Sequence, residues 1–501
     1  MKDGMHGAFG LLAAMLIIAP GWGKVPKMSD GQELTAGPVR LRFADGELRY
    51  LYVGDKEIVR RVYFAVRNGK WETAMPRFTQ TSVSSSNGGF KIDLKADCRA
   101  VGADFSWTGH IEGKSDGTIT FRAEGTPGTD FDSNRIGLCV LFGSPSLVGQ
   151  SFETVNAQNE TKAGRFPETV QPQLVAPDFQ TLRYTAQNGP TVAVSVVGAK
   201  FDMEDQRTYG DSSFKAYAPL SYAYPGVKKG DTKEETVTLT VANASGGAVQ
   251  KANGPAATVS VGAVLPGIVL PRLVEAAPDA KSSIFGNVNN QADQYKGAAK
   301  LTWGYTPFIH LPDNDTAMEN PVVLIDQART AHTYAPNATL LLDPVTLDGT
   351  KYRLDGKSDA RASEAFGGAW TAVFTHNAAL AGISEARLSV AQGAPNAPAR
   401  RVQQDLATHA GQTLRETTAV STSSHPSPID ALAVDTPKGT VLWVVNKSAR
   451  TQEVAVQGLP SGTVALHRVT GGTGDQNETT RVQTDLRLRL APYEVCRITP
   501  Q

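Results

Sequence analysis

Short runs of alternating polar and apolar residues follow one another from residue 34 to residue 244, and each run ends in a turn. Examples are residues 39–43, 48–53 and 191–196. Alternation with a period of two places successive side chains on opposite faces of a strand. Turn signals at intervals of about 8–12 residues are typical of an antiparallel sandwich. We therefore expect an N-terminal β-sandwich domain at residues 34–250.

The pattern changes after a segment rich in Ala, Ser and Gly at residues 243–256. Apolar strands now alternate with stretches of helical spacing, which is typical of parallel βα units. The expected strands are 258–262, 300–305, 339–345 and 386–390, and the expected helices are 320–334, 366–380 and 400–410. A closed (β/α)8 barrel takes about 250 residues. The region 255–412 is too short for that, so we expect a partial TIM-barrel-like domain of about four units.

Strand patterns return from residue 418 to the end of the chain, with apolar runs at 431–434, 440–445, 453–456 and 486–490. We expect a small C-terminal β-sandwich at residues 418–501. The predicted fold class is thus multidomain β and α/β: an N-terminal antiparallel β-sandwich, a shortened (β/α) TIM-type barrel remnant and a small C-terminal sandwich.

The charge balance excludes some classes of partner. The 49 Lys and Arg residues equal the 49 Asp and Glu residues, so the chain lacks the basic surface typical of nucleic-acid binding. The three cysteines cannot form a disulfide framework, and Cys139, within an apolar run, is interpreted as a buried, inert thiol. The eight histidines show no metal-binding spacing. We expect no metal and no cofactor.

The N-terminus resembles a secretory signal. Lys2 precedes an apolar stretch at residues 8–20, which is too short to cross a bilayer but suits a signal-peptide core. We expect a signal peptide at residues 1–23 and a periplasmic or secreted protein. The alternative is translation from Met28, which makes the protein cytoplasmic. We expect no integral membrane association.

Charged and aromatic residues are concentrated at residues 201–217. On a strand, Glu204 and Gln206 point to one side, and Asp205 and Arg207 to the other. Either pair suits a polyol, because sugar hydroxyls need both donors and acceptors. The alternative is a charged hairpin exposed to solvent.

A second set of candidates lies at the ends of the expected barrel strands, where the sites of such folds are found. His310, close to Asp313, is a candidate general base for water attack on a carbonyl group, and Arg207 is a candidate to stabilise the oxyanion. The alternatives are that His310 packs in a loop against Trp303 or Tyr305, and that Asp343 forms a turn rather than a binding site.

The segment 201–217, which reads Met-Glu-Asp-Gln-Arg and then Asp-x-Ser-Phe-Lys-x-Tyr, resembles the D-apionate lactonase family. Further similar stretches are residues 37–41, 60–67, 134–141, 164–167, 306–310 with Asp313, 368–371, and Trp71. The resemblance implies a β-sandwich, a TIM-type barrel and a C-terminal β domain. It also implies hydrolysis of a branched sugar-acid lactone, D-apionolactone, to D-apionate.

The sequence also departs from the family pattern. The barrel region is shorter, the carboxylate that usually ends one barrel strand is missing at residues 388–390, and Phe142 and Asn156 stand where the family often has histidine. Two alternatives to a lactonase therefore stay open: a non-catalytic carbohydrate-binding protein with a degenerate barrel, and a glycoside-hydrolase-like enzyme. The expected ligand is a small sugar-acid lactone or carbohydrate. A homodimer is expected if strand edges of the short barrel are left uncovered.

From these arguments we predict two groups of site residues. The predicted catalytic residues are Glu204, Asp205, His310 and Asp313. The predicted substrate-binding residues are Arg207, Asp211, Lys215, Tyr217 and Asp343.

Overall fold

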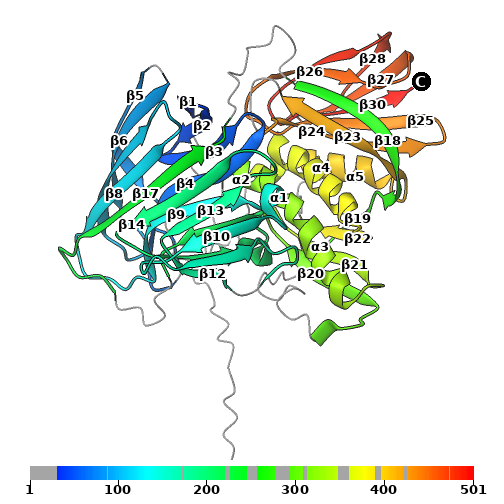
Figure 1. Ribbon diagram of the computed structural model, residues 1–501. Helices are drawn as coiled ribbons and strands as arrows, with labels where there is room; N and C mark the ends of the chain where they lie inside the picture. Colours follow the sequence, from blue (N-terminus) through cyan, green and yellow to red (C-terminus); the bar gives the residue numbers. More distant parts are fainter. Residues whose placement is uncertain are drawn as a thin grey trace, which may run out of the picture.

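The computed structural model describes residues 31–70, 72–86, 88–171, 174–219, 226–244, 257–276, 294–308, 313–347, 360–389, 396–421, 426–472 and 474–501. The expected signal peptide and His310 lie outside the described residues. Four sheets carry the architecture: two pack face to face in the N-terminal part, one is parallel and covered by helices, and one ends the chain (Figure 1).

The first sheet has eight strands in the order β1-β2-β3-β4-β9-β16-β15-β12. Its strands are β1 (Gln32–Ala36), β2 (Val39–Ala44), β3 (Glu47–Val53), β4 (Lys56–Arg67), β9 (Arg135–Gly143), β12 (Leu174–Phe179), β15 (Phe201–Asp205) and β16 (Ser213–Tyr217). The short helix α1 (Ser144–Leu147) follows β9. All strand pairs of the first sheet are antiparallel, as the alternating sequence pattern predicts.

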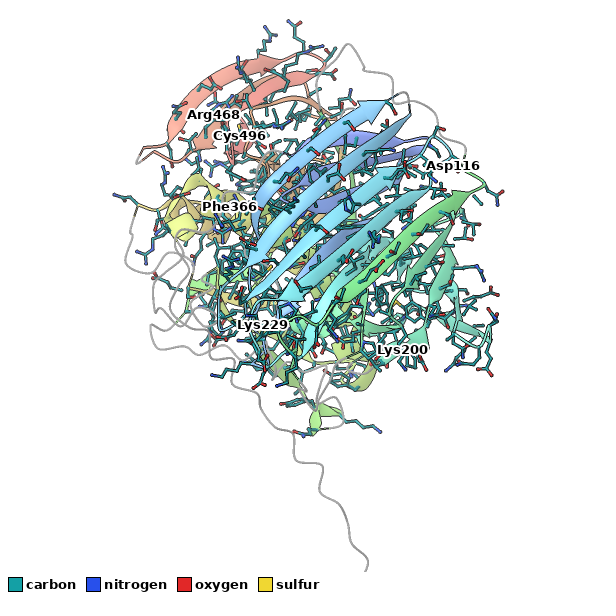
Figure 2. The ribbon with its side chains drawn as sticks, turned by 90° about the vertical axis from the view of Figure 1, so that its left-hand side faces the viewer. Asp116, Lys200, Lys229, Phe366, Arg468 and Cys496 are labelled. Carbon is teal, nitrogen blue, oxygen red and sulfur yellow. The ribbon has the colours of Figure 1, made fainter. Side chains whose placement is uncertain are left out.

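The second sheet has nine antiparallel strands in the order β11-β10-β13-β14-β17-β8-β7-β6-β5. They are β5 (Arg77–Ser86), β6 (Gly89–Cys98), β7 (Phe105–Gly113), β8 (Ile119–Pro127), β10 (Ser151–Val155), β11 (Thr161–Arg165), β13 (Thr181–Thr185), β14 (Thr191–Val197) and β17 (Lys233–Ala242). Figure 2 shows strands of this sheet side by side, with Asp116 in the β7–β8 turn. The core between the two sheets is one continuous apolar cluster that includes Val62, Phe64, Val140 and Phe214.

The third part is a four-stranded parallel sheet in the order β19-β22-β21-β20. Its strands are β19 (Arg272–Glu275), β20 (Lys300–Tyr305), β21 (Thr339–Val345) and β22 (Glu385–Leu388); its helices are α2 (Asn314–Glu319), α3 (Val323–Tyr334), α4 (Ala365–Leu380) and α5 (Pro398–Ala407). Parallel βα units are therefore present in this region. Within the described residues the sheet is open, and a TIM barrel is not formed.

The fourth sheet has nine strands in the order β28-β27-β30-β25-β24-β23-β18-β26-β29. They are β18 (Ala257–Val269), β23 (Thr413–Ser421), β24 (Ile429–Thr436), β25 (Gly439–Asn446), β26 (Gln452–Gln457), β27 (Gly462–Val469), β28 (Gln476–Val482), β29 (Leu486–Leu490) and β30 (Val495–Pro500). Its strands enclose a separate apolar core. Trp443 faces outward from that core and packs in the cluster that contains α4 and α5.

Strand β18 lies in a different sheet from the one that the sequence pattern predicts. The run 258–262 is a strand, but it does not open the parallel sheet: β18 pairs antiparallel with β23 and parallel with β26 in the C-terminal sheet. The first parallel strand is β19 instead. An apolar run of this length cannot reveal its partners, because pairing in a sheet is decided by contacts distant in sequence. The division into domains at 34–250, 255–412 and 418–501 stays a prediction.

Candidate functional site

The first sheet is buried on both faces along its central strands. Its inner face packs in the sandwich core, while its outer face carries a small separate apolar cluster that includes Tyr63, Cys139, Leu141 and Tyr217. Cys139 is a buried free thiol, as its apolar neighbours predict. Among these residues, the outer face also carries charged side chains that are cut off from bulk water.

A row of facing residues crosses five strands of this outer face. Lys215 on β16 lies opposite Glu204 on β15 and opposite Leu141 on β9. Leu141 in turn lies opposite Arg61, which faces Arg49. Side chains directly opposite each other in antiparallel strands have Cβ atoms about 4.5–5.5 Å apart. The row therefore gathers one carboxylate and three cations on a single covered surface.

Lys215 is the most unusual member of the row. The residue is 1% exposed, and its Nζ lies 5.0 Å from the centroid of the Tyr217 ring and 6.0 Å from that of Tyr63. No carboxylate of the described residues forms an ion pair with it. Burial, with the positive charge of Arg67, lowers the pKa of Lys215 to about 7.

Glu204 is held by its neighbours. Tyr217 Oη donates a hydrogen bond to Glu204 Oε2, and Gln206 Nε2 donates a second to the same oxygen at 3.1 Å. The carboxylate keeps a partly exposed edge, since 21% of the side chain is accessible. Glu204, Lys215 and Tyr217 are therefore predicted site residues that the fold brings together.

Arg135, at the start of β9, also lies on this surface. Its Cζ is 3.0 Å from the centroid of the Tyr217 ring, and its Nη2 is 3.9 Å from Glu204 Oε1. Burial lowers the pKa of Arg135 to about 10, so the guanidinium stays charged at neutral pH. Sequence reasoning did not select this residue or Tyr63. The sequence signal that could have identified these two residues is a polar residue at alternate positions of strands that are otherwise apolar on both faces.

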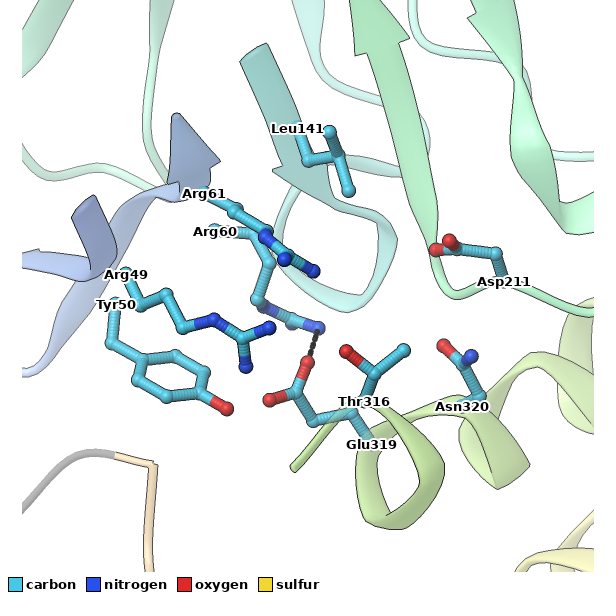
Figure 3. Close-up of a pocket in the computed structure, with 9 residues that line it drawn as sticks. All are labelled: Arg49, Tyr50, Arg60, Arg61, Leu141, Asp211, Thr316, Glu319 and Asn320. Atoms are coloured by element: carbon cyan, nitrogen blue, oxygen red, sulfur yellow. Dashed lines mark hydrogen bonds and ion pairs between the residues drawn. The ribbon is translucent and has the colours of Figure 1, made fainter. Parts of the chain in front are cut away.

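A small pocket opens beside the row (Figure 3). The volume of the pocket that the centre of a water molecule can occupy is about 20 Å³. Its lining residues come from the first sheet, from the turn before β16 and from α2 with the turn that follows: Arg49, Tyr50, Arg60, Arg61, Leu141, Asp211, Thr316, Glu319 and Asn320. The pocket thus lies where the sandwich meets the α2 region.

Two carboxyl groups line this pocket. Glu319 Oε2 accepts a hydrogen bond from Arg60 Nη1 at 3.0 Å, whereas its buried Oε1 has no partner. Burial raises the pKa of Glu319 to about 7. Asp211 Oδ1 accepts from Ser213 Oγ at 2.7 Å, and its charge favours the protonated form of Lys215. Asp211 therefore links the pocket to the lysine.

Asp205 and Arg207 form an internal ion pair, with Arg207 Nη2 at 2.7 Å from Asp205 Oδ2 and Nε at 2.9 Å from Oδ1. Arg207 also donates to the backbone oxygen of Pro167 and lies 3.1 Å from Asp326 on α3. Both side chains of the pair are 0% exposed. A guanidinium paired in this way with Asp205 and Asp326 joins the sandwich to α3. Neither is the segment 201–217 a solvent-exposed hairpin, because most of its residues are buried.

Asp313 begins helix α2. Its carboxylate accepts hydrogen bonds from Thr316 N at 2.9 Å and, through both oxygens, from Arg49 at 3.0 and 2.8 Å. Although burial opposes ionisation, Arg49 and Arg61 hold the pKa of Asp313 well below its usual range. The group stays ionised at neutral pH and links α2 to the first sheet.

Asp343 lies apart from these residues. It is on β21, and its Oδ2 is 3.5 Å from Arg387 Nη1 on the neighbouring strand β22. No hydrogen bond or ion pair joins it to the first sheet among the residues that the structure describes.

The fold and the site define the class of protein: it is a β-rich multidomain protein with a covered polar site on the outer face of its N-terminal sandwich. Two family models match the chain. The D-apionate lactonase N-terminal domain matches residues 22–244, and the D-apionate lactonase C-terminal immunoglobulin-like domain matches residues 426–498. Together they account for more than half of the chain, which belongs to the D-apionate lactonase family as a divergent member.

A curated relative is the D-apionate lactonase of Brucella anthropi, which is 28% identical over 220 residues. The match covers 43% of this chain and 36% of the relative, so it spans little more than a third of that protein's length.

Two solved structures have a distant likeness to this chain. A glycoside hydrolase family 44 endoglucanase from Clostridium acetobutylium has a TM-score of 0.32 at 10% identity, covering 42% of this chain and 50% of that one. An alpha-L-arabinofuranosidase from Thermotoga maritima has a TM-score of 0.31 at 13% identity, covering 40% and 52%. Likeness at this level carries no argument about function.

No described helix combines the length and apolar character needed to cross a membrane. No cluster of three or more His, Cys, Asp or Glu side chains with metal-binding geometry occurs among the described residues.

Proposed function

We propose that this protein opens the ring of a small sugar-acid lactone, D-apionolactone being the substrate that the family suggests, on the outer face of its first sheet. The observation that carries the proposal is Lys215: a buried amine without a carboxylate partner, whose pKa is lowered to about 7. A catalytic base works best when its pKa lies near the operating pH, and buried lysines are used in this way.

The proposed step is hydrolysis of the ester bond of the ring. The neutral Lys215 amine takes a proton from a water molecule, whose oxygen attacks the lactone carbonyl carbon. The tetrahedral intermediate then collapses, the bond between carbonyl carbon and ring oxygen breaks, and the ring oxygen takes the proton from the Lys215 ammonium and leaves as a hydroxyl group. Acid and alcohol remain joined in one open-chain molecule.

The other predicted residues take different roles in this proposal. Glu204, fixed by Tyr217, accepts hydrogen bonds from sugar hydroxyls through its exposed edge. Asp205, Arg207 and Asp313 are positioning residues, because their charged groups are occupied by partners within the protein. Roles for His310 and Asp343 stay predictions.

The finer points of architecture and location are also proposals. The open parallel sheet is what this chain keeps of a TIM-type barrel, with β19 to β22 as its strands. Export by a signal peptide at residues 1–23 and a homodimer are further proposals, which secretion assays and light scattering test.

The test follows acid release from D-apionolactone in a pH-stat with wild type, Lys215→Met and the control Lys162→Met, whose lysine is exposed on β11. We expect Lys215→Met to lose at least 100-fold in kcat and Lys162→Met to equal wild type. Equal rates for all three proteins contradict the role of Lys215. A wild type that binds polyols saturably without turnover contradicts the enzyme and favours the carbohydrate-binding alternative.

A further inference from the structure

The outer face of the first sheet carries more buried positive charge than the protein itself neutralises. Arg135 and Arg67 lie directly opposite each other on β9 and β4. Arg135 and Lys215 both approach the ring of Tyr217, at 3.0 and 5.0 Å from its centroid. The charges of both arginines lower the pKa of Lys215.

The hydrogen-bonding capacity of Arg135 is unused. Its side chain is 2% exposed, and neither Nε, Nη1 nor Nη2 has a hydrogen-bond partner. The Nε of Arg67 is likewise buried without a partner. The nearest acid to Arg135 is Glu204, at 3.9 Å, and that carboxylate already accepts two hydrogen bonds from Tyr217 and Gln206.

Such an arrangement is costly for a protein that binds nothing there. A buried charge without hydrogen bonds destabilises the folded state, and like charges beside it add repulsion. Buried arginines are normally paired or hydrogen-bonded. A ligand that supplies negative charge and planar acceptors removes both penalties.

We propose that Arg135, with Arg67 and Lys215, forms a subsite for the carboxylate group of an open-chain sugar acid. The guanidinium fork matches a carboxylate bidentately. A single negative charge suits the cluster, because Glu204 balances one of the three cations and Lys215 sheds its proton readily. The rings of Tyr63 and Tyr217 supply walls against which the carbon chain packs.

The inference deepens the proposed function, on which its biological meaning rests. A lactone is neutral, whereas its hydrolysis product is an anion. A cation cluster at the site therefore distinguishes product from substrate and holds the free acid more tightly. The same cations face the negative charge that develops on the carbonyl oxygen during water attack.

The first experiment measures binding alone, by calorimetry with wild type at pH 7. The ligands are sodium D-apionate, the neutral alditol of the same carbon skeleton and inorganic phosphate. We expect D-apionate to bind at least tenfold more tightly than the alditol and than phosphate. Equal affinity for acid and alditol overturns the inference, and tighter binding of phosphate overturns the carboxylate assignment.

Two matched variants locate the site. Arg135→Met should bind D-apionate and the alditol equally weakly, while Arg183→Met, which removes an exposed arginine of β13, should keep the wild-type preference. Preserved preference in Arg135→Met contradicts the subsite.

Thermal unfolding without ligand separates a binding role from a structural one. We expect Arg135→Met to melt at the same temperature as wild type or higher, because it removes a buried charge whose nitrogens make no hydrogen bonds. A lower melting temperature together with unchanged ligand preference means that Arg135 is structural and overturns the inference.

The binding data also separate this inference from the proposed function. A wild type that prefers the acid but leaves the lactone intact retains the subsite and refutes the hydrolase. A wild type that opens the lactone but binds acid and alditol alike retains the hydrolase and refutes the subsite.

Discussion

Lys215 and Glu204 lie directly opposite each other on β16 and β15, yet the carboxylate of Glu204 takes its hydrogen bonds from Tyr217 and Gln206 rather than from the lysine. The amine is left between two tyrosine rings. An ion pair would have raised the pKa of the lysine, whereas here burial beside other cations lowers it. This separation of two neighbouring opposite charges underlies the first two predictions.

The pH dependence of activity should report Lys215. Its folded-state pKa of about 7 lies below the usual lysine value, so the active neutral amine is lost as the pH falls through about 7. We expect kcat/KM of wild type to rise with pH and to level off above about pH 8. In Lys215→Met the residual activity should lack this limb. A wild-type profile that is flat between about pH 6 and about pH 8 contradicts the assignment of Lys215 as the base.

Removal of the Tyr217 hydroxyl should release Glu204. In Tyr217→Phe the ring that packs against Arg135 and Lys215 remains, but the hydrogen bond to Glu204 is lost. We expect a loss of about 1 kcal/mol in the free energy of unfolding and a rise in KM for the lactone. The control is Tyr334→Phe, because the buried Tyr334 Oη has no partner; it should be neutral or stabilising. Equal effects of the two substitutions would show that the Glu204 bond is unimportant.

Arg207 should prove structural. Arg207→Met leaves Asp205 buried without its partner, and breaking a buried pair in this way costs about 3–5 kcal/mol. The control Arg122→Met breaks an exposed pair with Glu234, for which little or no loss of stability is expected. Urea denaturation measures both. If Arg207→Met keeps wild-type stability and loses only activity, Arg207 contacts substrate after all.

Glu319 should make stability depend on pH. Its folded-state pKa is raised from 4.5 to about 7 by burial, so the folded protein binds a proton more tightly than the unfolded chain. The stabilisation from this proton is present below the unfolded pKa and is lost as the pH rises through about 7. Wild type should therefore lose stability relative to Glu319→Gln between about pH 5 and about pH 8. Parallel stability curves for the two proteins over that range would contradict the raised pKa.

Local patterns predicted most of the secondary structure. Strands β2, β3 and β14 and helix α4 lie where alternation or helical spacing placed them, because these periodicities depend on residues close in sequence. The contacts within 201–217 were also predictable in part: Gln206 does reach Glu204, and Arg207 does reach Asp205. The pairing of β18 with β23 was not predictable, since its partner lies about 150 residues away along the chain.

The candidate site shows the same division. Sequence similarity predicted Glu204, Lys215 and Tyr217 as site residues, but it predicted Asp205 and Arg207 equally strongly. The ion pair between Asp205 and Arg207 separates the two groups, together with the contact of Arg207 with Asp326 on a helix far along the chain. Charge and residue type alone do not show whether a side chain faces a ligand or another part of the protein.

The sequence by itself determined the strand-rich N-terminal region, the change to βα units, the return to strands and the family. These follow from short-range periodicity and from motifs that are contiguous in the chain. Only the tertiary structure decided that the outer face of the first sheet is covered, that the Arg135 guanidinium is buried there without a hydrogen-bond partner, and that the amine of Lys215 lacks a counter-ion. Burial and the sum of nearby charges depend on segments brought together by folding, and those two quantities set the protonation and binding properties of the site.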